Sequence, residues 1–187
     1  GMPIAGLDEK LSDPRLYEKL QATERAMRDM YRRAVHLMPP AFAKEDDEPA
    51  RLRTAVLDAL MGDKDLHEWD LTCVDLAGID FSGANLEGAF FEGANLEGCR
   101  FRGANAERTV FARARLARAD FEGARLAGTN LGEAHLDDAR FCKADLSRAV
   151  FYKSRLVRTD LTGVRLDKAD FSDSVMEQPV MNGLKAK

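Results

Sequence analysis

Three histidines and three cysteines are the side chains in this sequence that could carry catalytic or metal-binding chemistry. His36, His67 and His135 lie far apart, and none has a second ligand at the helical or loop spacing of a metal site. Cys142 is expected to face outward, but no base beside it would activate a thiol as a nucleophile. The patterns GxxxxGKS/T, GxSxG and HExxH do not occur. We therefore expect a protein that is not an enzyme and that holds no cofactor and no metal.

Charge and hydropathy place the chain among globular proteins. It has 28 Lys and Arg against 32 Asp and Glu, so it lacks the bulk positive charge of many nucleic-acid-binding proteins. No apolar run approaches the roughly 20 residues of a membrane-spanning helix. The cysteines are odd in number and unclustered, which fits a reducing compartment. We expect a cytoplasmic protein that binds neither nucleic acid directly nor a membrane.

A five-residue period runs through the chain from Trp69 onward. A large residue recurs at Leu71, Leu76, Phe81 and every fifth position as far as Met176, with one exception. Each of these large residues is the centre of a five-residue repeat. The residue two before each centre is small, and the residue two after it is often Gly. This period fits neither an α-helix nor a regular strand. It predicts short extended segments that point the large and the small residue inward, joined by corners where Gly is favourable.

The large centres also alternate in kind, and this second pattern predicts four sides per coil. Every core Phe lies at a position ending in 1, and the centres ending in 6 are Leu apart from Ala106 and Met176. Four sides per coil stack residues of the same kind on one another, whereas three sides would mix them. The 22 centres from Leu71 onward then predict about 5.5 coils. One column of buried, stacked rings is expected to hold Phe81, Phe101, Phe121 and Phe141.

The stretch AGIDFSGANLEGAFFEGANLEGCRFRGAN resembles the pentapeptide-repeat family, whose A(D/N)LxX units wind into a right-handed quadrilateral β-helix. The resemblance covers about residues 69–176 and implies a mainly β solenoid. Ala106 departs from the family pattern at a core position, and Arg, Val or Phe often replaces Asp or Asn just before the centre. The motif is specific for the fold and says little about function.

Residues 1–68 lack the repeat and predict an α-helical extension or cap. A helix-start signal ends at Pro14, apolar residues follow at helical spacing, and Pro39 begins a Pro-Pro stop. We expect a long helix over about 13–38 and, after an acidic linker, a short helix over about 50–61.

The last residues, 177–187, form a predicted C-terminal tail or cap. They carry Val180, Met181 and Leu184, too few apolar residues for a second core and too many for a solvated tail. They are expected either to fold under the last coil or to pair with a second molecule. A homodimer through the C-terminal end is slightly preferred, because a short tail covers the open end of a β-helix poorly.

Charges on one outer side alternate in sign from each coil to the next. The residues just before the centres there are Asp80, Arg100, Asp120, Arg140 and Asp160. We interpret them as a ladder of exposed ion pairs, each worth about 0–1 kcal/mol. A slip by one coil would place like charges together, so the ladder favours one register.

The neighbouring side carries apolar residues where polar ones are usual. Its outward slot holds Phe90, Val110, Asn130 and Val150, and Tyr152 lies beside them. Apolar groups on a solvated wall need a cover or a partner. One interpretation is that the long N-terminal helix folds back onto them. The other is that Phe90, Val110, Val150 and Tyr152 form a protein-binding site.

Two functions follow from these patterns. The first is a protein–protein interaction scaffold, because solenoids present rigid faces. The join between the helices and the first repeats is similar to that of pentapeptide-repeat proteins encoded with type VI secretion systems, which implies a partner from that machinery or its cargo. The alternative is a DNA mimic of the fluoroquinolone-resistance type that binds gyrase or topoisomerase IV. It ranks lower because residues 100–118 hold six Arg against one Glu.

Overall fold

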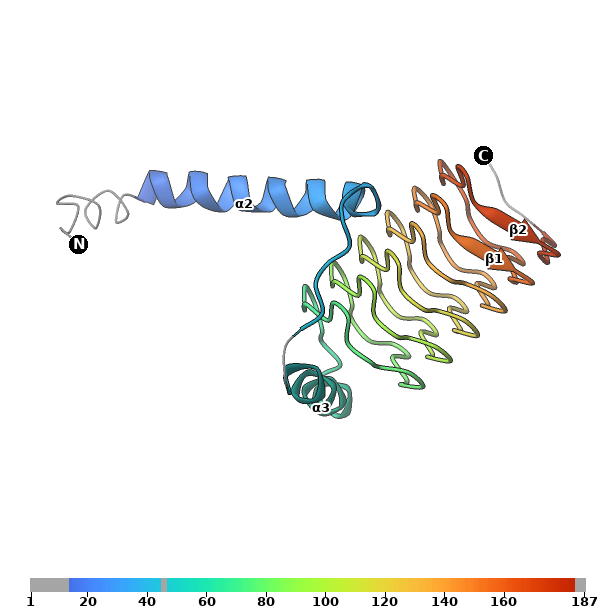
Figure 1. The fold of residues 1–187 in the computed structure, drawn as a ribbon, viewed down its shortest axis with the longest axis horizontal. Helices are drawn as coiled ribbons and strands as arrows, with labels where there is room; N and C mark the ends of the chain where they lie inside the picture. Colours follow the sequence, from blue (N-terminus) through green and yellow to red (C-terminus); the bar gives the residue numbers. More distant parts are fainter. Residues whose placement is uncertain (1–13, 45–46, 184–187) are drawn as a thin grey trace.

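The computed structural model describes residues 14–44 and 47–183, which form a helical N-terminal part and a β-helix (Figure 1). The helical elements are α2 (Pro14–Ala34), the 3-10 helix η1 (Val35–Leu37) and α3 (Glu48–Met61). The strands are β1 (Arg155–Val157) and β2 (Val175–Glu177).

Both helices differ slightly from their predicted bounds. The long helix predicted over 13–38 ends as an α-helix at Ala34, because the chain tightens there into η1. The short helix predicted over 50–61 begins earlier, at Glu48. Pro49 lies in its first turn, where a residue without an N–H group breaks no helical hydrogen bond.

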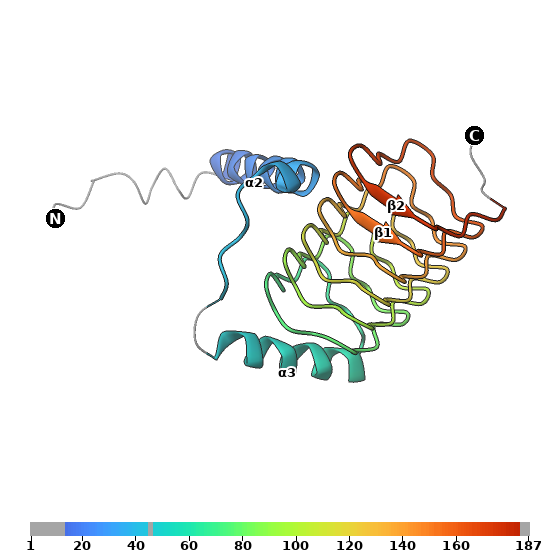
Figure 2. The same ribbon diagram turned by 45° about the vertical axis from the view of Figure 1, so that its right-hand side comes forward.

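Parallel bridges join one residue of each five-residue segment to the residue 20 positions later, one coil further on, and they define the β-helix (Figure 2). They run from Asp65↔Asn85 to Asp160↔Val180, one for each five-residue segment. The corner after each segment has a positive φ, for example 67° at Gly98, which is why Gly recurs in that slot.

The β-helix is longer at both ends than the range 69–176 predicted from the sequence. Its first bridge is made by Asp65, ahead of the predicted start at Trp69. At the other end, β2 pairs in parallel with β1, and Val180 bridges Asp160. The residues assigned to a tail therefore begin as a continuation of the coil. Leu184 lies outside the described residues.

Stacked Phe rings fill the interior, as predicted. The ring centroids of Phe101 and Phe121 lie 4.6 Å apart, and those of Phe121 and Phe141 lie 4.8 Å apart, with nearly parallel planes. All three rings are fully buried. Outside, Asp80 and Arg100 are exposed, but the prediction was wrong for Asp120. Its side chain is largely covered because it accepts a hydrogen bond from Arg102 Nε at 2.8 Å.

Helix α3 lies across the N-terminal end of the β-helix (Figures 1 and 2). Val56 belongs to the buried core, and Leu52, Leu60 and Trp69 pack against that core. This cover removes the first coil's apolar end from water. At the opposite end, Val175, Val180 and Met181 stay exposed in the described part of the chain.

Helix α2 touches the β-helix only near its C-terminal end, and the rest of it extends away (Figures 1 and 2). The apolar side chains of Leu20, Met27 and Met30 are therefore 50%, 60% and 57% exposed. No helix in the described residues is long and apolar enough to span a membrane.

The inward and outward positions predict very different costs on truncation. Phe121→Ala should lower the free energy of unfolding by about 3–5 kcal/mol, because it opens a cavity in the ring stack. Arg100→Ala should cost less than about 1 kcal/mol, because its ion pair with Asp80 is exposed and 3.7 Å long. Chemical denaturation of both variants checks this, and equal costs would contradict the assignment of inward and outward positions.

Candidate functional site

The apolar column predicted from the sequence lies under the C-terminal end of α2 and under η1. The side of the β-helix that carries this column and faces α2 is called the wall. Val110 is fully buried in a small cluster with Val35. Phe90 is half-buried, with its ring centroid 6.0 Å from that of Tyr31. The interpretation that the N-terminal helix covers the column therefore holds for these two residues. Val110 is corrected from a partner-binding residue to a docking residue, because the chain's own helix seals it from solvent.

The other two predicted site residues lie at the edge of the same contact. Tyr152 is half-buried beside His36, with ring centroids 5.3 Å apart. Val150 is half-buried and lines a cleft between α2 and the wall. The structure therefore brings all four predicted residues to one surface, but that surface is the one on which α2 and η1 dock.

Asn130 explains why one polar residue interrupts the apolar column. Its Nδ2 donates to the carbonyl oxygens of Arg32 at 2.8 Å and Arg33 at 3.3 Å. It also lies 2.9 Å from Nδ1 of His36. The last carbonyls of a helix have no partner within the helix, so this amide acts as a C-terminal cap supplied by the β-helix.

Arg113 caps the turn that follows. Its guanidinium donates to three carbonyl oxygens, those of Val35 (3.3 Å), His36 (3.2 Å) and Met38 (2.6 Å). The rigid fork of donors in Arg suits such a set of acceptors. The same group forms an ion pair with Glu92 at 2.7 Å, so its charge is balanced.

Glu92 is the buried acid of this contact, with 1% of its surface exposed. It accepts hydrogen bonds from the Tyr31 hydroxyl and, at 3.0 Å, from the backbone N–H of Ala41. Burial and the neighbouring Glu92 carboxylate raise the pKa of Tyr31. Because Arg113 neutralises Glu92, the buried carboxylate holds α2 and the following loop on one point of the wall.

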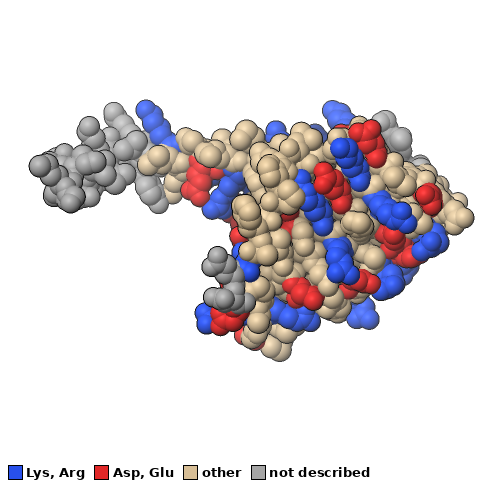
Figure 3. Space-filling model, viewed as in Figure 1, with Lys and Arg blue, Asp and Glu red and all other residues tan. Residues whose placement is uncertain are grey.

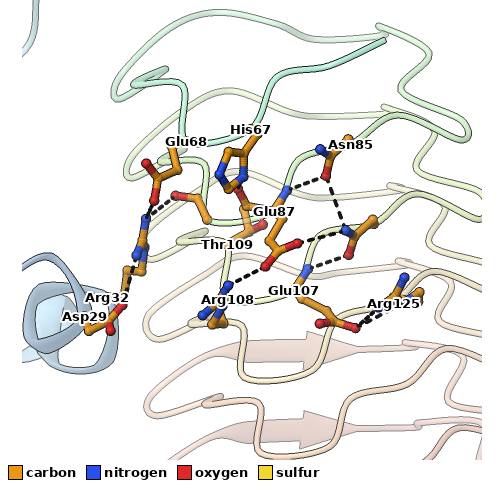
Figure 4. A network of polar contacts seen from close by, with 12 residues as sticks. Asp29, Arg32, His67, Glu68, Asn85, Glu87, Glu107, Arg108, Thr109 and Arg125 are labelled. Atoms are coloured by element: carbon orange, nitrogen blue, oxygen red, sulfur yellow. Dashed lines mark hydrogen bonds and ion pairs between the residues drawn. The ribbon is translucent and has the colours of Figure 1, made fainter. Parts of the chain in front are cut away.

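A second anchor comes from Arg32, which is 8% exposed (Figure 4). It donates to Glu68 at 2.9 Å and to the carbonyl of Gly88 at 3.2 Å, and it forms an ion pair with Asp29 at 3.0 Å. The guanidinium lies over the Phe90 ring, 5.2 Å from its centroid, where a cation is attracted to the ring face.

Gly132 gives η1, which directly follows α2, room to reach the wall. A Cβ at this position would lie 2.4 Å from Cβ of His36, which is closer than any two such atoms approach. It is the single Gly in the slot directly after a centre between Phe81 and Phe171. That exception was the available sequence signal, and the sequence reasoning missed it together with Glu92 and Arg113.

An apolar groove lies where α2 meets the wall. It has a volume of about 430 Å³ and is lined by Met27, Met30, Tyr31, Met38 and Phe90, among others. Methionine side chains adapt to many apolar shapes, so a groove of this composition suits a protein segment.

The described residues hold no cluster of three His, Cys, Asp or Glu that could bind a metal. Burial raises the pKa of Cys99 to about 12, and burial and Asp160 raise the pKa of Cys142. Both changes disfavour the nucleophilic thiolate.

Gly132→Ala should release the end of α2 from the wall. The φ of Gly132 is not positive, so Ala brings no backbone strain, and the effect reports the new contacts with His36 and, at 3.1 Å, with Oδ1 of Asn130. We expect amide hydrogen exchange over residues 31–38 to speed up at least about tenfold, equivalent to about 1.4 kcal/mol. The thermal unfolding of the β-helix should change little. Adding His36→Gly should recover part of the protection, because it removes the clash but also the contacts of His36 with Asn130 and Tyr152. Unchanged exchange in the single variant would contradict the close contact.

Docking of α2 should weaken in acid. Burial lowers the pKa of His36 and the charge of Arg113 adds to this, while the hydrogen bond with Asn130 and the charge of Glu133 oppose it only in part. A histidine with a lowered pKa is neutral in the docked state, so its contribution is complete above about pH 6.5 and is lost as the pH falls through the lowered pKa. NMR of the Asn130 side-chain amide at pH 7.5 and 5.5 should report the loss. His36→Gln, which accepts a hydrogen bond but does not titrate, should remove the pH dependence.

Comparisons with known proteins identify the repeat region of the chain. The family model described as "Pentapeptide repeat region" matches residues 94–171, and that described as "Pentapeptide repeats (8 copies)" matches residues 65–98. A search of curated proteins finds no match.

Solved structures that are similar to the chain include three pentapeptide-repeat proteins. Rfr23 from the cyanobacterium Cyanothece 51142 is 20% identical over 69% of this chain and 99% of its own, with a TM-score of 0.35. QnrB1, a plasmid-mediated fluoroquinolone resistance protein, is 19% identical over 66% and 64%, with a TM-score of 0.38. HetL, involved in heterocyst differentiation regulation in the cyanobacterium Nostoc sp. strain PCC 7120, is 23% identical over 62% and 71%, with a TM-score of 0.28.

These likenesses say nothing of what this chain binds. The two family models together span residues 65–171, which is more than half of the 187 residues. They also coincide with the parallel 20-residue register of the bridges. The chain therefore belongs to the pentapeptide-repeat proteins, whose repeats form a right-handed β-helix.

Proposed function

We propose that this protein is a non-enzymatic protein–protein interaction scaffold in the bacterial cytoplasm, and that α2 is the element that its partner binds. One observation carries the proposal: the wall clamps α2 by one end and leaves the apolar side chains of Leu20, Met27 and Met30 half or more exposed. An apolar stripe on a projecting helix costs solubility unless a partner covers it.

The composition of α2 indicates the kind of partner. Its exposed apolar residues recur at three- and seven-residue spacing, so they share one face of the helix. The helix has six Arg and Lys against three Asp and Glu. A complementary partner would offer an apolar groove with an acidic rim, in the manner of helix-in-groove recognition. The groove at the base of α2 would take up an apolar side chain of that partner.

The DNA-mimic alternative finds little support in the surface charge. Figure 3 shows basic and acidic side chains interspersed over the face it presents. Arg102, for example, forms ion pairs with both Asp120 and Glu122. A mimic of duplex DNA needs a continuous negative field, which paired charges do not supply.

The resemblance to proteins encoded with type VI secretion systems motivates one class of partner, a component or cargo of that machinery. That resemblance lies at the join between the helices and the first repeats, which follows α2 in the chain.

Met30→Glu should abolish partner capture, because it places a charge in the middle of the apolar stripe. Purified full-length protein would be used as bait in an extract of its own bacterium, with captured proteins identified by mass spectrometry and binding then measured with the purified partner. Ala22→Glu, an exposed change on the same helix, is the matched control and should bind as the unmodified protein does.

Equal loss in both variants, or no loss in either, would contradict a role for the stripe. Stoichiometric inhibition of gyrase supercoiling by the purified protein would instead favour the DNA-mimic function.

We also propose that the C-terminal end pairs with that of a second molecule. Val175, Val180 and Met181 are 39–46% exposed there, and β2 has a hydrogen-bonded neighbour, β1, on one side. Unpaired strand edges beside apolar groups favour association about a two-fold axis. Light scattering should give a dimer for the full chain and a monomer for a chain truncated at Glu177, whereas a monomeric full chain would contradict the pairing.

A further inference from the structure

A cleft of about 740 Å³ lies between the C-terminal half of α2 and the wall, separate from the apolar groove. Four arginines line it: Arg32 and Arg33 from α2, and Arg108 and Arg148 from the wall. Gly128 lies at the corner between the two wall arginines, and a Cβ at this position would lie 3.7 Å from Cγ of Arg108, an ordinary contact. Strands about 4.8 Å apart place those corners roughly 10 Å from each other.

Four of the five arginines at corners of the β-helix form an ion pair with an acid of the previous coil. One of these pairs joins Arg158 to Asp138, which precedes it by one coil. The other three arginines each form an ion pair with a Glu that precedes them in the chain by one coil and one further position. The pairs are Arg108 with Glu87, Arg113 with Glu92, and Arg118 with Glu97. The 20-residue register explains this pairing. An acid directly after a centre lies next to the corner of its own coil, and that corner lies directly under the corner arginine of the next coil.

Arg148 is the corner arginine that has no acid at either of these positions in the previous coil, where Gly128 and Ala127 lie. Among the described residues no ion pair to Arg148 is found. Arg33, on the facing helix α2, likewise has no ion pair among the described residues. Two uncompensated guanidinium groups therefore line one cleft, on opposite walls.

The acids beside the cleft are already engaged. Asp29 forms an ion pair with Arg32 at 3.0 Å, and Glu107 is bound by Arg125, whose Nε lies 2.9 Å away (Figure 4). Arg32 keeps one further donor, since its buried Nε has no hydrogen-bond partner among the described residues. The local excess is positive, and the donors that remain are guanidinium N–H groups.

We propose that this cleft binds the phosphate groups of a small molecule, a site that goes beyond the scaffold function. Arginine recognises phosphate with two parallel N–H donors, and the volume lies within the range of small-molecule sites, about 300–1,000 Å³. A ligand here would touch Arg33 on α2 and Arg148 on the wall at once. Binding would therefore stabilise the docked position of α2 as well as occupy the cleft.

Calorimetric titration of the full-length protein with pyrophosphate and with ADP tests the site. We expect saturable binding of at least one probe, at least about tenfold weaker with Arg148→Ala, since loss of a charge-assisted contact costs about 1.4 kcal/mol or more. Ala127→Glu restores the missing acid and should abolish binding without harming the fold. Arg118→Ala removes a corner arginine that has its acid, and it should leave the affinity within about twofold.

A second readout separates binding in the cleft from binding elsewhere. The bound probe should slow amide hydrogen exchange over residues 31–38 in the unmodified protein and not in Ala127→Glu. No binding of either probe at millimolar concentration, or equal losses with Arg118→Ala and Arg148→Ala, would overturn the proposal. Citrate binding as tightly as pyrophosphate would overturn the assignment to phosphate and indicate a carboxylate site. None of these outcomes depends on whether α2 binds a protein partner.

Discussion

The hydrogen bonding of each coil to the next in a single fixed register is the constraint on which the rest of this molecule depends. It places every slot of the repeat directly above the same slot of the previous coil. Inside, this aligns rings such as Phe101 and Phe121 face to face. Outside, it aligns one residue from each coil in a column. The charge, size and polarity of the wall can therefore change from one coil to the next. The wall is therefore rigid, and its chemistry can be changed one residue at a time.

Function in such a molecule should be sought where a column departs from its own pattern. Asn130 replaces an apolar residue, and it caps the helix that covers its neighbours. Gly132 replaces a longer side chain, and the side chain of His36, in η1 just after that helix, approaches there. Ala127 replaces the acid that a corner arginine normally has, and Arg148 is left without an ion pair in the described structure. Because the repeat sets the residue type expected in each slot, a single exception is informative.

The sequence predicted the β-helix, its period and its core well, because those depend on contacts that recur with every side and every coil. It did not predict how α2 sits. The spacing of Leu20, Met27 and Met30 is that of a buried face, yet these side chains are exposed and a neighbouring face makes the contact. Polar contacts decide that orientation, among them those of Glu92 and Arg113. Both resembled ordinary surface charges, since the backbone groups that they bind belong to a distant part of the sequence.

Clamping a helix by its C-terminal end has a consequence for binding. An isolated helix of this length is marginal in water, because starting a helix costs more conformational entropy than its first hydrogen bonds return. Here Asn130 and Arg113 satisfy the terminal carbonyls and hold the last turn in place, so the preceding turns only need to propagate. A partner that binds the exposed stripe then meets a helix already formed. It avoids most of the ordering cost that a flexible arm would impose. Loosening the clamp at Asn130 or Arg113 should therefore weaken binding, even though neither residue lines the groove proposed for the partner.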